Sequence, residues 1–175
     1  MNYIMKSGCL CNEQSGEALA KIKSTFSGPS KRIHLSETNT EYHTDIRKLD
    51  APADRSTDVR FREYYLGNQG NTVMTGRPGY AEGEDPLVTG WPICRLPRVD
   101  HAQIRIGGNE YHLAMHNGQN YTLKDKTGYV ILQIMHRGLI GGWLFYDDHG
   151  FTPEILCGLF AFCRYIEQEN EFLIV

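Results

Sequence analysis

The sequence predicts a mainly β protein, in which a closed antiparallel β-barrel encloses a hydrophobic C-terminal helix. Between Ala102 and Tyr146, apolar and polar residues alternate in short runs separated by glycine-containing turns, a pattern typical of antiparallel strands. From Ile155 to Ile166, only Gly158 and Arg164 are not apolar. A helix that is apolar on all sides must be enclosed by other elements. At 175 residues, the chain suits one domain over residues 1–175.

The N-terminal third alternates less regularly but still predicts strands. These are expected at Ala18 to Lys23, Arg32 to Leu35, Thr40 to Arg47 and Arg60 to Leu66. Residues 76 to 97 fit neither the strand nor the helix period. A segment of this length is either an extended crossover between two halves of a sheet or a binding loop.

The later strands form a meander. Ile104 and Ile106 alternate with polar residues before a Gly-Gly break, and Asn117-Gly118 is the two-residue signal of a type I′ hairpin. Val130, Leu132 and Ile134 then face one way. Antiparallel strands at this spacing close into a barrel or stack as a sandwich.

The helix is expected from Pro153 to about Gln168. Thr152 can cap it, Pro153 suits the first helical position, and Glu154 complements the positive end of the helix dipole. The apolar run is shorter than the roughly 20 residues that cross a bilayer, so strands must surround it. The side chains expected to fill the barrel are Ile155, Leu156, Leu159, Phe160, Phe162 and Ile166. A barrel filled in this way leaves its outside or its rim for a site.

Two short segments follow the apolar run. Glu167, Glu169 and Glu171 are expected to form the solvated end of the helix, with partner binding as the alternative. The apolar residues 172 to 175 could form a closing strand.

The C-terminal half resembles a known superfamily. Pro153 followed by Phe160-Ala161-Phe162-Cys163 resembles the terminal signature of tubby proteins, where a proline precedes Phe-Ala-Ile-Cys at the same interval. The run from Tyr121 to Gly128, with the strand and Gly-Gly-Trp that follow, is similar to units of LURP-one-related proteins. The resemblance to this tubby-like superfamily implies a closed barrel threaded by one hydrophobic helix. Its members include phosphoinositide binders and lipid scramblases, although a fold alone does not assign an activity.

The composition of the chain argues against several classes of function. The formal net charge is −3, which gives no overall attraction to nucleic acid, so no nucleic-acid partner is expected. The N-terminus lacks the apolar stretch of a secretory signal. The five cysteines follow no zinc-ribbon spacing and are expected to be reduced thiols. We therefore expect a cytoplasmic protein without a transmembrane span, placed in the cytoplasm or peripherally at the membrane.

One stretch is locally basic. Residues 95 to 137 carry six Lys or Arg against three Asp or Glu, and guanidinium groups bind phosphate through paired N–H donors. The candidate anion-binding residues are Arg95, Arg98, His101, Arg105 and Arg137. The alternative is a set of solvated residues that pair with Asp100 and Glu110.

Acid–base and metal-binding groups are sparse. Asp147-Asp148-His149 is the tightest such group, and its alternative role is to hold a turn before the helix. His112 and His116 would lie about 13 Å apart on a strand, too far to share a metal ion. No metal, cofactor or nucleophile motif is expected.

These observations favour a non-catalytic binding domain whose partner is an anionic lipid headgroup, such as a phosphoinositide, or a protein. The competing hypothesis is a small enzyme with a rim site near Asp147, Asp148 and His149. The oligomeric state is left open.

Overall fold

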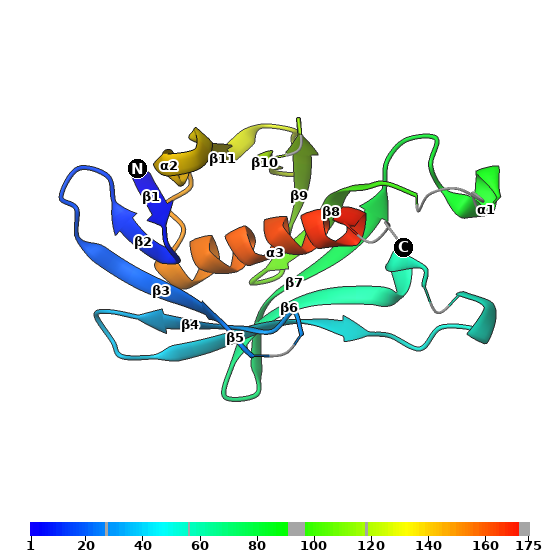
Figure 1. Cartoon of the computed structure of the whole chain (residues 1–175), viewed down its shortest axis with the longest axis horizontal. Helices are drawn as coiled ribbons and strands as arrows, with labels where there is room; N and C mark the ends of the chain where they lie inside the picture. Colours follow the sequence, from blue (N-terminus) through cyan, green and yellow to red (C-terminus); the bar gives the residue numbers. More distant parts are fainter. Residues whose placement is uncertain (27, 56, 91–96, 118, 172–175) are drawn as a thin grey trace.

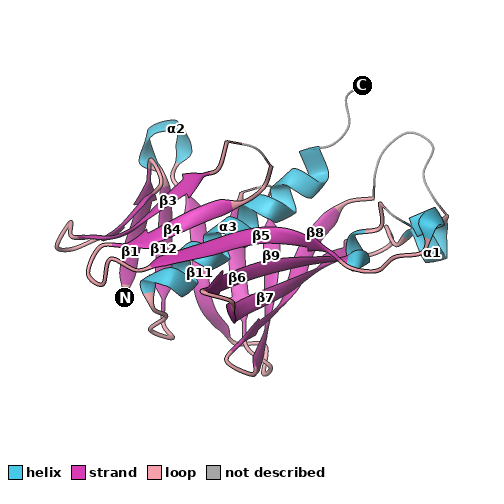
Figure 2. Cartoon of the chain, turned by 90° about the horizontal axis from the view of Figure 1, so that it is seen from below, coloured by secondary structure: helices cyan, strands magenta, loops and turns pink. Residues whose placement is uncertain are grey.

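The computed structural model describes residues 1–26, 28–55, 57–90, 97–117 and 119–171. Within them, twelve strands form one closed antiparallel β-barrel around the last helix, as Figures 1 and 2 show. The strands are β1 (Asn2–Lys6), β2 (Cys9–Asn12), β3 (Ala18–Ser24), β4 (Lys31–Leu35), β5 (Glu41–Lys48), β6 (Arg62–Asn68), β7 (Asn71–Tyr80), β8 (Val99–Ile106), β9 (Asn109–His116), β10 (Asn120–Lys124), β11 (Val130–His136) and β12 (Trp143–Asp147). The helices are α1 (Pro86–Thr89), α2 (Gly138–Gly141) and α3 (Pro153–Glu171), with 3₁₀ turns at Ala53–Arg55 and Val59–Phe61. The predicted fold class is confirmed.

Each strand pairs with its neighbours in sequence, and the barrel closes where β1 meets β12. Tyr3 lies opposite Phe145, and Met5 lies opposite Trp143. The meander therefore ends in a barrel and not in a sandwich. β1 and β2 were not predicted, because their apolar residues are consecutive, at Tyr3 to Met5 and Cys9 to Cys11, and do not alternate with polar ones.

The connections alternate between the two ends of the barrel, because consecutive strands are antiparallel. One end, which we call the mouth, carries the β1–β2, β3–β4, β5–β6, β7–β8, β9–β10 and β11–β12 connections. The helix α3 enters at the opposite end and finishes at the mouth. There the Asn170 side chain accepts a hydrogen bond from the Val99 N–H and donates one to the Val99 carbonyl, at 2.9 and 2.7 Å.

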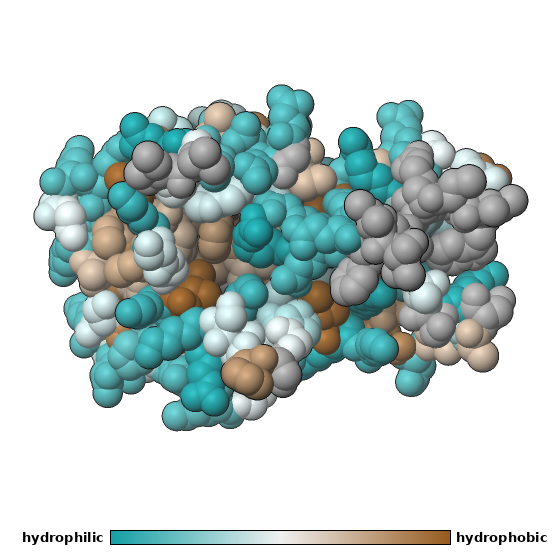
Figure 3. All heavy atoms as spheres, in the orientation of Figure 1, coloured by the Kyte–Doolittle hydropathy of each residue, from teal (hydrophilic) through white to brown (hydrophobic). Residues whose placement is uncertain are grey.

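The helix supplies the centre of the core. Leu156, Phe162 and Ile166 are fully buried, and the Phe162 ring packs 5.5 Å from that of Tyr64 on β6. Phe160, expected in the interior, is only partly buried. It belongs to a half-buried stripe of α3 with Arg164 and Gln168, spaced four residues apart on one face. In Figure 3, hydrophobic residues show in a recess of an otherwise hydrophilic face.

Two expected boundaries differ from the structure. α3 continues to Glu171, because the polar residues beyond Ile166 find partners inside the mouth. β7 extends to Tyr80 into the segment without a period. The absence of a side chain at Gly79 lets β7 pass close to His101 on β8, since a Cβ atom at position 79 would lie 2.2 Å from Nε2 of His101. The possible closing strand at residues 172 to 175 lies outside the described residues.

Candidate functional site

The described arginines near β8 pair with carboxylates on the outer surface. Arg98 lies 3.4 Å from Asp100, and Arg105 lies 2.7 Å from Glu110. His101 Nδ1 is 2.8 Å from Asp100 Oδ1. The structure thus brings Arg98 and His101 together around one carboxylate, while Arg105 lies near the other end of the same strand.

Of the other two members of the predicted anion site, Arg137 does not join this group. Arg137 precedes α2, in a connection that begins at β11, three strands from β8 in the barrel order. Arg95 lies outside the described residues. An anion site built from these residues stays a prediction.

The histidines of β8 and β9 form a shallow polar patch. The rings of His101 and His112 lie 5.2 Å apart, and burial, aided by the nearby His101, lowers the pKa of His112. Gln103 contacts His112, whereas His116 contacts Thr122. In the part of the chain that the structure describes, no three His, Cys, Asp or Glu side chains are grouped to hold a metal ion.

The acid–base group before α3 holds a turn. Asp147 is 1% exposed, and its carboxylate accepts backbone N–H bonds from His149, Gly150 and Phe151 at 3.0, 3.0 and 2.8 Å. His149 is exposed, with its ring 4.5 Å from that of Phe151. A carboxylate engaged by three N–H donors serves the turn, which is the alternative role predicted for it.

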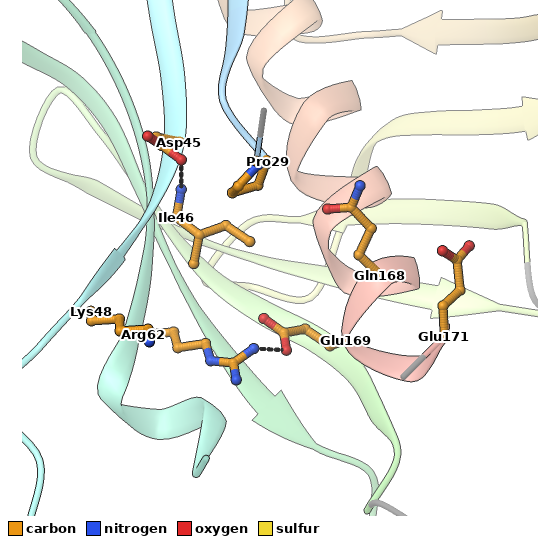
Figure 4. A pocket seen from close by; sticks show the side chains of 9 residues that line it. Pro29, Asp45, Ile46, Lys48, Arg62, Gln168, Glu169 and Glu171 are labelled. Carbon is orange, nitrogen blue, oxygen red and sulfur yellow. Dashed lines mark hydrogen bonds and ion pairs between the residues drawn. The ribbon is translucent and has the colours of Figure 1, made fainter. Parts of the chain in front are cut away.

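A pocket lies in the mouth, between α3 and the adjacent strands. We call it the mouth pocket; its volume is about 830 Å³. Figure 4 shows α3 on one side and β5, β6 and the β3–β4 connection on the other. The lining residues are Gly28, Pro29, Asp45, Ile46, Lys48, Arg62, Gln168, Glu169 and Glu171.

One wall of the mouth pocket is fixed to the helix by Tyr165. Its hydroxyl donates a hydrogen bond to the Pro29 carbonyl at 2.9 Å and lies 3.2 Å from Thr44 Oγ1. Burial raises the pKa of Tyr165, so the hydroxyl stays protonated and can donate. The β3–β4 connection is therefore held against the last turns of α3.

Glu169 is the buried charge of the mouth pocket. Its side chain is 4% exposed, and Oε2 forms an ion pair with the Arg62 guanidinium. Its other oxygen, Oε1, is buried and has no hydrogen-bond partner among the described residues. Figure 4 shows this oxygen on the side that faces Ile46 and Pro29. A buried carboxylate oxygen without a donor is costly, so this atom has unfilled hydrogen-bonding capacity.

Tyr64 lies close to this carboxylate without bonding to it. Burial, followed by the charge of Glu169, raises the pKa of Tyr64 well above its ordinary value. The Tyr64 hydroxyl is itself buried and lacks a partner among the described residues. Two buried side-chain oxygens, the Tyr64 hydroxyl on β6 and Glu169 Oε1 on α3, therefore have unfilled hydrogen-bonding capacity. Both lie near the end of α3.

Glu167 forms a second buried group, two residues before Glu169 and about 200° around α3 from it. The Tyr121 hydroxyl lies 2.5 Å from Glu167 Oε1 and 3.1 Å from the Cys163 carbonyl oxygen, and Arg164 forms an ion pair with Glu167 Oε2. The expectation that the acidic residues at the end of α3 are solvated is wrong for Glu167 and Glu169, which are 9% and 6% exposed. It holds for Glu171, which is exposed.

Charge and shape set what the mouth pocket can bind. Three carboxylates, Asp45, Glu169 and Glu171, face two cations, Lys48 and Arg62, so the lining is acidic by one charge. Ile46 and Pro29 add apolar surface. Pockets of this size hold small organic molecules, and the acidic balance favours a ligand that carries a positive group.

The sequence offers no local signal for the mouth pocket. Arg62 and Glu169 are 107 residues apart, and nothing in the spacing of either residue identifies the other as its partner. The nearest signal is the group of acidic residues after the apolar run, whose pattern predicts a solvated helix end.

No family model, curated protein or solved structure matches the chain. The tubby-type resemblance therefore stays a prediction. Within the described residues, no helix has the length and apolar character needed to cross a membrane.

Proposed function

We propose that this chain is a small-molecule-binding domain whose ligand carries a protonated amine and enters the mouth pocket. The observation that carries this proposal is Glu169 Oε1, a carboxylate oxygen that is buried beside the pocket without a hydrogen-bond donor. The proposal keeps the predicted class, a non-catalytic binding domain, and places the site at the mouth of the barrel.

The ligand chemistry follows from the lining. An ammonium group can donate to Glu169 Oε1 while Arg62 keeps its bond to Oε2. A charge-assisted hydrogen bond of this kind is stronger than a neutral one. The apolar part of the ligand would lie against Ile46 and Pro29, which line the pocket opposite α3.

The two expectations from the sequence have less support. For an anionic headgroup, the arginines Arg98 and Arg105 are already paired with carboxylates. For a small enzyme, Asp147 is engaged by the turn before α3. Among the described residues of these two groups, none has a buried polar atom that lacks a hydrogen-bond partner, as Glu169 has.

Binding of 2-phenylethylamine, measured by calorimetry and by two-dimensional NMR, tests the proposal. We expect binding of the amine, chemical-shift changes on α3 and β5, and much weaker binding of 2-phenylethanol, which has the same ring and chain but no charge. Glu169→Gln should weaken amine binding by about tenfold or more, because hydrogen bonds to charged groups contribute roughly 1.5–3 kcal/mol.

Glu171→Gln is the matched control, since it makes the same change two residues further along α3 at an exposed position. It should change the affinity by less than about threefold, because exposed charges contribute little. The proposal is wrong if the amine fails to bind, or if it binds the wild type and Glu169→Gln equally well. Preferential binding of inositol hexakisphosphate would favour the anion hypothesis instead.

A further inference from the structure

Two cysteines of β2 lie side by side on the outside of the barrel. The Cys9 and Cys11 sulfur atoms are 3.6 Å apart, and both side chains are partly exposed. Leu10 between them is fully buried, so the two thiols share the outer face of the strand. Neither cysteine lines the mouth pocket, so the pair is independent of the proposed ligand.

The Cys9 and Cys11 sulfur atoms lie closer to each other than two positions on one face of a strand require. Side chains two residues apart on one strand face are separated by about 6.6 Å along the strand, so these two lean toward each other. The register of β2 against β3 shifts between Leu10 and Cys11, and such a β-bulge bends and twists the strand locally. A disulfide needs a sulfur–sulfur distance of about 2.05 Å, so a modest side-chain movement would close the pair.

The surroundings of Cys9 are basic. Lys6 on β1 and Lys21 on β3 lie directly across from Cys9 in the two registers. Directly opposed residues share a face of the sheet, so both ammonium groups flank this thiol. An anionic disulfide such as oxidised glutathione therefore meets positive charge at Cys9.

We infer that Cys9 and Cys11 are a redox-active dithiol that low-molecular-weight disulfides convert into an intrachain disulfide. The Cys9 thiolate attacks oxidised glutathione, forms a mixed disulfide and releases one glutathione thiolate. The Cys11 thiol loses its proton, attacks the Cys9 sulfur and releases the second glutathione thiolate. The protein loses two protons and two electrons, equal to two hydrogen atoms, and one molecule of oxidised glutathione becomes two of the reduced form.

Other thiol chemistry is less compatible with the surroundings of these two cysteines. A tetrahedral metal site needs four ligands, and no group of three suitable side chains occurs among the described residues. Cys157 and Cys163 are fully buried, and burial raises the pKa of both thiols. They should stay unreactive in the folded protein and serve as internal controls.

Peptide mapping of the full chain after treatment with oxidised glutathione tests this inference. Cys9 and Cys11 fall in one tryptic peptide, residues 7 to 21, which should lose two hydrogen atoms and carry no glutathione. Cys11→Ser should trap a stable glutathione adduct on Cys9, because the thiol that releases it is missing. Cys94→Ser should react like the wild type, which separates this pair from the remaining cysteine.

Three results would overturn the inference. They are a wild-type peptide that keeps glutathione on both cysteines, a disulfide from Cys9 or Cys11 to another cysteine, and a peptide that stays unmodified while exposed dithiols in the same solution are oxidised. Circular dichroism of each variant before treatment confirms that the folded protein is being tested.

Discussion

At the scale of single residues, several buried carboxylates of this barrel have different roles because their donors differ. Asp147 is satisfied by three backbone N–H groups and holds a turn. Asp58 is satisfied by the side chains of Arg60 and Tyr80. Glu169 has a donor for one oxygen only. All three carboxylates are buried, so burial does not distinguish them. Glu169 differs from Asp147 and Asp58 because one of its two oxygens lacks a hydrogen-bond donor.

Asp58 gives a prediction about pH. Burial raises its pKa, but the hydrogen bonds and charge of Arg60 outweigh burial, and the pKa lies below its ordinary value of 3.8. A carboxyl group with a lowered pKa in the folded state stabilises the fold above its ordinary pKa, and this stabilisation is lost as the pH falls through the lowered value. At pH 7, Asp58→Asn should lower the free energy of unfolding by about 2 kcal/mol.

Urea unfolding of the two proteins between neutral and acidic pH measures this difference. It should be constant down to about pH 5 and shrink below the ordinary carboxyl pKa. Asp148→Asn, an exposed change, should stay within about 0.5 kcal/mol of the wild type throughout. A difference for Asp58→Asn that does not vary with pH would show that the ionised carboxylate is not the stabilising group.

At the scale of elements, α3 is the feature that both organises the core and builds the mouth pocket. Its first turns bury apolar side chains, while its last turns bury Glu167 and Glu169 against Tyr121 and Arg62. One helix thus passes from a dry core into a polar rim. The rigidity of the core is what holds Glu169 in position, since the same helix is fixed at Phe162 and Tyr165.

Two phenylalanines of α3 test how the helix is oriented in the barrel. Phe162 is fully buried, whereas Phe160 is partly buried against Trp143 and Phe145. Phe162→Ala should lower the free energy of unfolding by about 3–5 kcal/mol. Phe160→Ala should cost about half as much, because less of its surface is removed from water. An equal or larger loss for Phe160→Ala in urea unfolding would place the half-buried stripe elsewhere on the helix.

The elements that the sequence predicted well are those whose signal is local. Alternation in the meander and the unbroken apolar run of α3 are both visible within a few residues, because each reports how an element faces its neighbours. The burial of Glu169 depends on Arg62, 107 residues earlier, and no local pattern encodes such a contact. Asp147 is intermediate, since its three donors follow within four residues and the local sequence already allows a turn held by this group.

At the scale of the whole molecule, closure of the barrel depends on the pairing of its first strand, β1, with its last strand, β12. We call this pairing the seam. β1 pairs with β12 from Asn2↔Tyr146 to Met5↔Trp143, and the N-terminal amine donates to the Asp147 carbonyl at 2.5 Å. Contacts this far apart in sequence form only after a large loss of chain entropy. The other strand pairs join sequence neighbours, so the seam is the contact that converts an open sheet into a barrel around α3.

Gly142 sits at this seam and tests its contribution. Its φ is +70°, and a Cβ atom added there would lie 2.4 Å from the Met5 carbonyl oxygen, which is fixed backbone of β1. Gly138 in the same connection has a similar φ of +74° but open space around its Cβ position. Both alanine variants bear the cost of a positive φ, and the cost is larger at Gly142, whose ψ of −143° lies near a region that is essentially restricted to glycine. Only Gly142→Ala also pushes β1 away from β12. Gly142→Ala should therefore be the less stable variant by at least about 1 kcal/mol, and its β1 and β12 amides should exchange with deuterium faster than those of β6 and β7. Equal stability and equal exchange in the two variants would mean that the seam tolerates separation and that the barrel does not depend on it.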